Sequence, residues 1–229
     1  MGLGKGLLDL LFPPKCAFCG RVMDDPGDGI CPTCVKELPW SGGRSRKCDF
    51  VSSVTAPLYY EGTVREAILR YKFNAAPARG AVFGRVLARE LTRREINDYD
   101  LITWAPLNPK RKRRRGYDQA QLIAQAAARS LGAEAVCLLQ KIRNAPPQSG
   151  IRTPEKRRAN VSGCYAVIDR ELVKDKRVLI IDDVITTGAT VSECARMLML
   201  AGAKSVRAAS LAYPRNEKKP IEPYEVTDI

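Results

Sequence analysis

Histidine is absent from the 229 residues of this sequence. This absence excludes catalytic triads that contain histidine and metal sites that mix histidine with cysteine. Any general acid or base in the chain must therefore be a carboxylate, a lysine, a tyrosine or a cysteine. The sequence also lacks a G-x-x-x-x-G-K-[ST] loop, and no G-x-G-x-x-G follows an expected strand, so two common nucleotide-binding signatures are missing.

Long apolar runs are missing as well, and no segment approaches the length of a membrane-spanning helix. The leucine-rich residues 1–12 are too short to span a bilayer and carry no small-residue cleavage site, so we expect no signal peptide. Aromatic residues make up only 7% of the chain, with tryptophan at Trp40 and Trp104 alone. No stacking platform for nucleic-acid bases is therefore evident.

Negative charge is scarce relative to positive charge, and the formal net charge is +13. Residues 99–160 contain 13 lysines and arginines against 4 acidic residues, so most of the excess lies in this region. Such a regional surplus indicates a polyanionic partner, namely pyrophosphate, a nucleic acid or an anionic surface.

Six adjacent cations, Lys110–Arg115, follow an expected strand at Leu101–Trp104 and a proline-rich turn. In a doubly wound sheet this position is an active-site edge. We interpret the run as an anion-binding loop with two functional alternatives that do not exclude each other: a pyrophosphate-binding loop, or a contact with single-stranded nucleic acid. A solvated charged loop is the structural alternative.

Cysteine is plentiful, with eight residues, and four of them form the pattern C-x2-C-x11-C-x2-C. Two such turns complete a tetrahedral four-thiolate zinc site, which is structural because no coordination position remains for water. The pattern predicts zinc and a reducing cytoplasm, whereas four unrelated buried thiols or two disulfides are the alternatives. The expected zinc ligands are Cys16, Cys19, Cys31 and Cys34. Core packing is expected for Cys48, Cys137, Cys164 and Cys194.

The segment Val178–Thr190 joins an apolar run to two aspartates and a loop rich in threonine. The apolar run predicts a buried parallel strand, and ligands of open α/β sheets bind at the carboxyl ends of such strands. The loop then opens an expected helix, whose free N–H groups and positive dipole end favour a phosphate. A core strand that ends in Asp182-Asp183 before a turn is the alternative. A receiver domain also carries an acidic pair after an apolar strand, but there the pair follows the first strand; we do not expect one here, because only residues 184–229 follow the pair.

Alternating strand and helix patterns predict an α/β fold with a doubly wound, mainly parallel sheet. We expect a zinc module and linker over residues 1–48, with the linker at 40–49, and the α/β domain over residues 49–229. Capping boxes are expected at Thr63 with Glu66 and at Thr190 with Glu193, and Asp118 is expected to cap a helix that ends before Gly132. The expected strands are 51–60, 101–104, 135–139, 164–168, the run from Val178, and 206–213, and a further helix is expected at about 81–94.

These motifs together resemble the ComF family, the competence-associated proteins that include the GntX-like group. The family's Arg-Gly-Phe-Asn-Gln-Ala element is similar to Arg115–Ala120, and the segment Val178–Thr190 resembles the fingerprint for 5-phosphoribosyl-1-pyrophosphate (PRPP) of type I phosphoribosyltransferases. Ala145 departs from the family pattern, which has threonine there. Further matches are the four zinc-module cysteines and Arg143, Gln148, Gly150, Arg157, Asn160, Val161 and Gly163.

The resemblance implies an enzyme that binds PRPP with Mg2+ and transfers the phosphoribosyl group to an acceptor that the sequence does not identify. Asp182 and Asp183 would accept hydrogen bonds from the ribose hydroxyls. Arg114, Arg115 and Lys72 would neutralise the leaving pyrophosphate, which makes Arg115 catalytic together with the two aspartates. The residues that would cradle the 5-phosphate are Thr186, Thr187, Gly188, Ala189 and Thr190.

The resemblance also implies a plausible homodimer and a loop, Gln140–Ser162, that could close over the site. A rival interpretation comes from another class of function. The fold could serve as a non-catalytic nucleic-acid-handling or interaction module in competence, where Lys110–Arg115 contacts single-stranded DNA during uptake.

Overall fold

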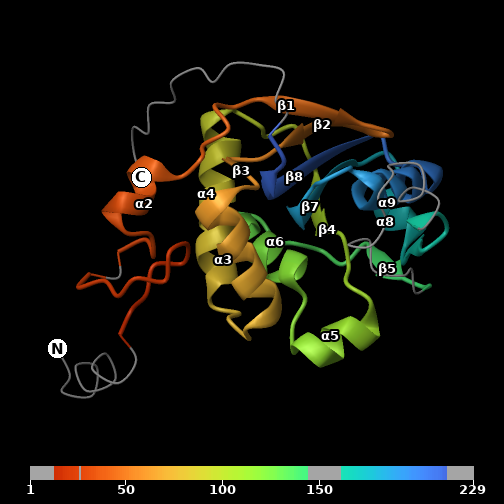
Figure 1. Ribbon diagram of the computed structural model, residues 1–229. Helices are drawn as coiled ribbons and strands as arrows, with labels where there is room; N and C mark the ends of the chain where they lie inside the picture. The colour runs from red at the N-terminus through yellow and green to blue at the C-terminus, as the bar shows by residue number, and fades with distance from the viewer. Residues whose placement is uncertain (1–12, 26, 144–160, 216–229) are drawn as a thin grey trace.

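The computed structural model describes residues 13–25, 27–143 and 161–215. Its main sheet has the strand order β1-β2-β8-β7-β4, and β3 also pairs with β8 (Figure 1). All neighbouring strands are parallel except β1 and β2. The strands are β1 (Ser45–Cys48), β2 (Val51–Thr55), β3 (Leu58–Tyr59), β4 (Leu101–Trp104), β7 (Arg177–Val184) and β8 (Ser205–Tyr213). The predicted mainly parallel α/β fold is confirmed.

Helices cover both faces of this sheet, as Figure 1 shows. One face packs against α3 (Gly62–Phe73), α4 (Arg79–Arg93) and α6 (Gln119–Ser130). The other face packs against α9 (Ala189–Leu200), α8 (Arg170–Val173) and a separate antiparallel pair, β5 (Leu139–Lys141) with β6 (Tyr165–Val167). The described residues also contain two shorter helices, α2 (Pro32–Glu37) and α5 (Pro109–Arg115).

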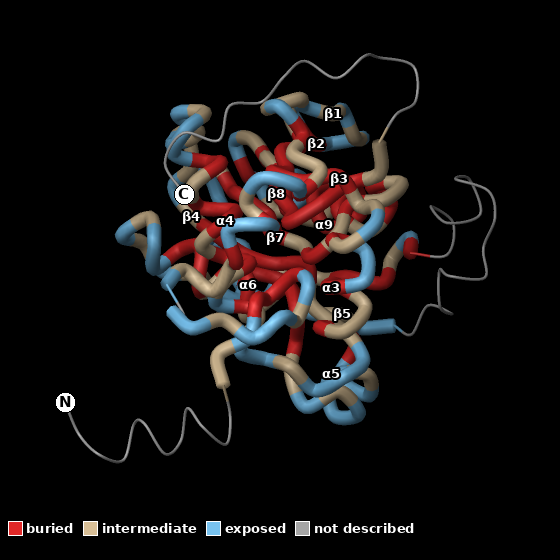
Figure 2. Tube along the Cα trace, turned by 60° about the vertical axis from the view of Figure 1, so that its left-hand side comes forward, coloured by how far each residue is buried: buried red, intermediate tan, exposed pale blue. Residues whose placement is uncertain are grey.

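The central strand β7 supplies side chains to both layers of the core because successive residues of a strand point to opposite faces. Leu179 and Ile181 pack with the α3, α4 and α6 side, whereas Val178 and Ile180 pack with the α9 side. Figure 2 shows the buried residues concentrated along this sheet and the exposed ones at its periphery, including α5. The same alternation continues into the two aspartates at the end of β7. It therefore determines the face of the sheet to which each aspartate side chain points.

The N-terminal module packs directly on α3 and α4. Phe18 lies against Phe83, with ring centroids 5.3 Å apart, and Arg70 donates a hydrogen bond to the carbonyl of Phe18. Asp28 forms an ion pair with Arg89 at 2.5 Å. Because the buried cysteines and Phe18 belong to the same hydrophobic cluster as α3 and α4, the module shares a core with the α/β sheet.

Two sequence-based expectations near the first strands are wrong. The expected linker at residues 40–49 contains β1, which extends the main sheet by antiparallel pairing with β2. The expected strand at 51–60 is interrupted between β2 and β3, and Pro57 lies in the gap. Proline has no N–H to donate to a ladder, so a break at this residue is physically reasonable.

The expected capping boxes do not form, although both helices do. Helix α3 begins after Glu61, and α9 begins after Gly188, so neither Thr63 nor Thr190 is at a capping position. Asp118 caps α6 as predicted, accepting a hydrogen bond from the N–H of Gln121. The expected strand at 135–139 forms only in part: Ala135 makes a single parallel bridge with Ile102 of β4, and Leu139 belongs to β5, which pairs with β6 outside the main sheet.

None of the helices in the described part of the chain combines the length and the apolar character that crossing a membrane requires.

Candidate functional site

A cavity of about 400 Å³ opens at the carboxyl ends of β4 and β7. This is the edge where ligands of open α/β sheets bind. Its polar lining combines acidic and basic side chains from both faces of the sheet. The lining residues are Tyr60, Lys72, Ala105, Pro106, Leu107, Arg111, Arg115, Asp118, Gln119, Ala120, Lys141, Tyr165, Asp182, Asp183, Val184, Thr186 and Thr190.

The two aspartates belong to β7, which runs through both of them to Val184 instead of ending before them. Asp183 lies on the α3 side, where its Oδ1 forms a 2.9 Å ion pair with Nζ of Lys72. Asp182 points to the opposite face and accepts a 2.8 Å hydrogen bond from the N–H of Asp183. The structure therefore brings both aspartates and Lys72 into one cavity while giving the two carboxylates different partners.

The electrostatics of these three groups follow from burial and proximity. Burial raises the pKa of Asp182 to about 8, and the neighbouring Asp183 carboxylate acts in the same direction. Burial alone would lower the pKa of Lys72, but the attraction of Asp183 raises it above its ordinary value. Lys72 and Asp183 thus form a charged pair, whereas Asp182 holds a proton over much of the neutral pH range.

The loop between β7 and α9 forms a second, smaller recess of about 50 Å³ beside Asp182. Gly188 is the residue before α9 and has φ +80°, a conformation that side-chain-bearing residues rarely adopt. A Cβ at this position would lie 2.3 Å from Sγ of Cys48 on β1. Gly188 has no side chain to cap α9, and the N–H of Ala189 donates a long hydrogen bond of 3.5 Å to Oγ1 of Thr187. The first residues of α9 line this recess, where a helix leaves N–H groups without intrahelical partners. The recess is lined by Asp182, Val184, Ile185, Thr186, Thr187, Gly188, Ala189, Thr190 and Val191.

The basic run Lys110–Arg115 forms helix α5, not the predicted loop. Asn108 caps this helix through a 2.9 Å hydrogen bond from the N–H of Lys110, and Pro109 occupies the first turn, where its missing N–H is not needed. Arg111 and Arg115 line the large cavity. Arg114 lines neither this cavity nor the smaller recess before α9. The guanidinium of Arg115 lies 5.0 Å from the ring centroid of Phe73.

Several cavity residues are missing from the sequence-based prediction. Arg111 and Gln119 lie in predicted motifs, but no pattern distinguishes them from their neighbours. Lys141 and Tyr165 approach each other only because β5 pairs with β6, with Nζ of Lys141 2.9 Å from the hydroxyl of Tyr165. The expected strand ended at residue 139, so Lys141 was not expected to lie in a strand or to pair with β6. Residues 144–160, most of the loop expected to close over the site, lie outside the described residues.

The four predicted zinc ligands come together in the N-terminal module. The sulfur atoms of Cys16, Cys19, Cys31 and Cys34 all lie within 4.8 Å of one another. Burial raises the pKa of the Cys16 thiol, but backbone N–H donors of Cys31, Cys19 and Phe18 outweigh this effect and lower the pKa to about 7. A cluster of four thiol ligands from two tight turns fits the donor set of a structural zinc ion.

Two family models match the chain. A double zinc ribbon domain matches residues 7–57, and a phosphoribosyl transferase domain matches residues 117–229. The first contains the cysteine cluster, and the second contains the acidic pair and the recess before α9.

Relatives of known name extend over most of the chain. Competence protein ComFC of Streptococcus pneumoniae is 30% identical over 208 residues, which cover 86% of this chain and 86% of the relative. DNA utilization protein YhgH of Salmonella typhimurium is 30% identical over 195 residues, covering 84% and 81%. Among solved structures, the glutamine PRPP amidotransferase from B. subtilis is 24% identical with a TM-score of 0.40, covering 58% of this chain and 26% of that one.

Proposed function

The chain belongs to the ComF family, and on that premise we propose that its cavity binds PRPP with Mg2+ and transfers the phosphoribosyl group to an acceptor, releasing pyrophosphate. The observation that carries the proposal is the recess before α9. There a glycine with φ +80°, the first turn of α9 and three threonines surround a space of about 50 Å³ next to Asp182. Such a recess suits a phosphate group.

The acidic pair supports the assignment of the sugar. A 5-phosphate in the recess would place the attached ribose over the end of β7, within reach of both aspartates. Asp183 forms an ion pair with Lys72, and its carboxylate oxygens accept hydrogen bonds, whereas a protonated Asp182 both donates and accepts. Mg2+, which prefers oxygen ligands, would be held chiefly by ribose and pyrophosphate oxygens and would neutralise part of the pyrophosphate charge.

The cations on the α3 and α6 side support the assignment of the leaving group. Departure of pyrophosphate leaves a ribosyl centre with cationic character, so the reaction needs positioning and charge neutralisation more than a covalent nucleophile. Lys72 and Arg115 line the cavity on this side, and Arg111 extends the positive lining along α5. In this proposal the three residues stabilise the developing negative charge on pyrophosphate. Arg114 does not line the cavity, so the structure supports this role less for Arg114 than for the other three residues.

Titration calorimetry with PRPP and Mg2+ tests the proposal. We expect Asp182→Asn together with Asp183→Asn to abolish binding while the circular dichroism spectrum stays that of the wild type. Asp100→Asn is a matched control, because Asp100 pairs with Arg177 at the opposite end of the same strand. Unchanged PRPP affinity in the double variant would remove the sugar-binding assignment.

A second candidate function is a nucleic-acid-handling role in competence. Helix α5 carries six cations and buries none of its residues. Relatives are named for competence and DNA utilization. A protein of this kind would contact the backbone of single-stranded DNA through α5, with affinity that falls steeply as salt rises. DNA binding that survives Asp182→Asn with Asp183→Asn but is lost when α5 is neutralised would favour this function.

The predicted zinc site also supports a proposal for the cellular compartment in which the protein works. Four ligand thiols need to stay reduced to bind the ion, so we propose that the protein works in the cytoplasm.

A further inference from the structure

Lys141 and Tyr165 form a polar pair in the cavity that the proposed reaction does not yet use. Nζ of Lys141 donates to the hydroxyl of Tyr165 at 2.9 Å and lies 4.7 Å from the centroid of the same ring. Both side chains line the cavity, and Tyr165 is 2% exposed. Among the described residues no carboxylate forms an ion pair with Lys141. A largely buried ammonium without a carboxylate partner is a ready position for an anionic ligand.

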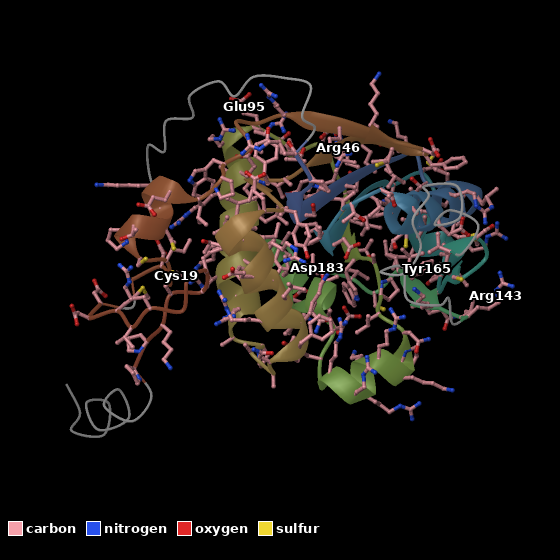
Figure 3. All side chains as sticks on the ribbon, viewed as in Figure 1. Cys19, Arg46, Glu95, Arg143, Tyr165 and Asp183 are labelled. Carbon is pink, nitrogen blue, oxygen red and sulfur yellow. The ribbon has the colours of Figure 1, made fainter. Side chains whose placement is uncertain are left out.

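The pair lies on the other face of the sheet from Lys72 and Arg115, two of the cations assigned to pyrophosphate. Tyr165 packs in the cluster that contains Ile180, on the α9 side, whereas Lys72 meets Asp183 on the side of Ile181. Figure 3 shows Asp183 near α3 and α6 and Tyr165 near β5. The cavity therefore has two cationic walls, separated by the end of β7.

Displacement at the ribose carbon requires the acceptor to approach from the side opposite the leaving group. If pyrophosphate lies against Lys72 and Arg115, the opposite wall is the one that holds Lys141 and Tyr165. This step rests on the proposed function, because it takes the position of pyrophosphate from it.

We propose that Lys141 and Tyr165 form the acceptor-recognition position and select an acceptor that carries a carboxylate group. The ammonium supplies a charge-assisted donor to one carboxylate oxygen. The Tyr165 hydroxyl accepts from Lys141, so its own proton is directed to the second oxygen. Burial raises the pKa of Tyr165, which keeps that proton in place at neutral pH. Burial also lowers the pKa of Lys141, as expected for a cation that lacks a paired anion.

The test compares acceptor candidates that differ in a carboxylate: nicotinate with nicotinamide, orotate with uracil, and anthranilate with aniline. Binding to the full chain, with PRPP and Mg2+ present, is measured by saturation-transfer NMR, and pyrophosphate release is followed in parallel. We expect at least one carboxylate compound to bind about tenfold more tightly than its neutral counterpart, as a charge-assisted contact would give.

Lys141→Met should erase this preference, Tyr165→Phe should reduce it, and Lys141→Arg should retain it. Lys204→Met, at an exposed lysine, is the matched control and should change nothing. Equal binding within every pair, or a preference that survives Lys141→Met, would overturn the proposal. If Lys141→Met fails to fold, Tyr165→Phe and the comparison of wild-type affinities still decide.

Calorimetry with PRPP and Mg2+, without an acceptor, separates failure of this proposal from failure of the proposed function. We expect Lys141→Met to bind PRPP with wild-type affinity. Weakened PRPP binding in this variant alone would assign Lys141 to the pyrophosphate and overturn the acceptor role, leaving the proposed function standing. Absence of PRPP binding by the wild type would instead overturn the proposed function, and the acceptor role with it.

Discussion

Asp182 and Asp183 are identical in chemistry and adjacent in sequence, yet the strand they share gives them different surroundings. The alternation of β7 turns Asp183 toward Lys72 and leaves Asp182 with a backbone N–H as its partner. Asp183 forms an ion pair, whereas burial favours the neutral form of Asp182. Such separation of two like groups is typical of functional sites, where residues need distinct protonation states.

Asp182 should make the stability of the unliganded protein depend on pH. Its pKa is about 8 in the folded state against an ordinary value of 3.8, so the folded state binds the extra proton between these limits. The free energy of unfolding therefore contains a contribution from this proton that is fully present below about pH 4. This contribution is lost as the pH rises through the folded pKa of about 8. Asp182→Asn removes the ionisation, so we expect this variant to exceed the wild type by about 1–2 kcal/mol at pH 8.5 and to match it near pH 4.

Urea unfolding at pH 4, 6 and 8.5 measures this difference. Asp100→Asn is a control of opposite sign, because the ion pair and hydrogen bonds with Arg177 lower the pKa of Asp100 and favour its charged form. Stability curves of wild type and Asp182→Asn that run parallel across this pH range would contradict the assignment.

Gly188 should be intolerant of any side chain. Gly188→Ala forces a Cβ to within 2.3 Å of Sγ of Cys48 at a residue with φ +80°. We expect a loss of about 1–3 kcal/mol in unfolding free energy from the strained backbone, together with weaker PRPP binding as the recess shifts. Chemical denaturation and calorimetry measure the two effects.

Adding Cys48→Ala to Gly188→Ala removes the clashing sulfur but leaves the backbone conformation unfavourable. We therefore expect the double variant to recover only part of the stability, relative to Cys48→Ala alone. Full recovery would mean that the φ angle of Gly188 is not under strain when a side chain is present.

At the scale of elements, α5 shows how local signals can outweigh charge repulsion. Six adjacent cations disfavour a helix through like-charge pairs, but Asn108, Pro109 and Gly116 supply a cap, a preset first turn and a left-handed end. The helix directs Arg111 and Arg115 into the cavity and leaves other cations on the surface. Helix α5 thus carries two sets of cations, one that lines the cavity and one that lies on the surface.

This division permits a test that separates DNA contact from PRPP binding. Lys110→Ser with Arg113→Ser and Arg114→Ser neutralises cations outside the cavity lining while keeping Arg111 and Arg115. If α5 contacts single-stranded DNA, the salt slope of log K should become shallower by about 2, because each contact to a single strand contributes about 0.7. PRPP affinity should stay unchanged.

Fluorescence anisotropy with a labelled single-stranded oligonucleotide at several salt concentrations measures the slope. A wild-type affinity that does not depend on salt would exclude the backbone contact. A triple variant that loses PRPP binding as well would show that the two cationic sets are not separable.

Strands with a continuous apolar run and helices with a clear N-cap residue could be predicted from the sequence. The apolar run from Val178 predicts a buried parallel strand, and Asp118 predicts the start of α6; both are confirmed. The linker interpretation of residues 40–49 was wrong because β1 is short and polar and is stabilised by pairing with β2. The proximity of Lys141 to Tyr165 depends on a strand pair between distant segments, which no local pattern encodes.

At the scale of the whole molecule, the zinc module and the α/β sheet share one hydrophobic cluster. Phe18 packs on Phe83, and Phe83 packs on Tyr71 with ring centroids 5.3 Å apart. Tyr71 precedes Lys72, which pairs with Asp183 in the cavity. A continuous set of packed side chains therefore connects the cysteine cluster with the candidate site.

Because the core is shared, we expect the entire fold to depend on zinc. Cys34→Ser removes a buried ligand, and structural zinc supplies folding free energy directly, so we expect a loss of several kcal/mol. Because Phe18 and Phe83 belong to one cluster, thermal unfolding should remain a single transition at a lower temperature, with PRPP affinity reduced in step. Cys137→Ser, at an exposed cysteine outside the cluster, is the control. Two separate transitions, the upper one at the wild-type temperature, would show instead that the module folds independently of the sheet.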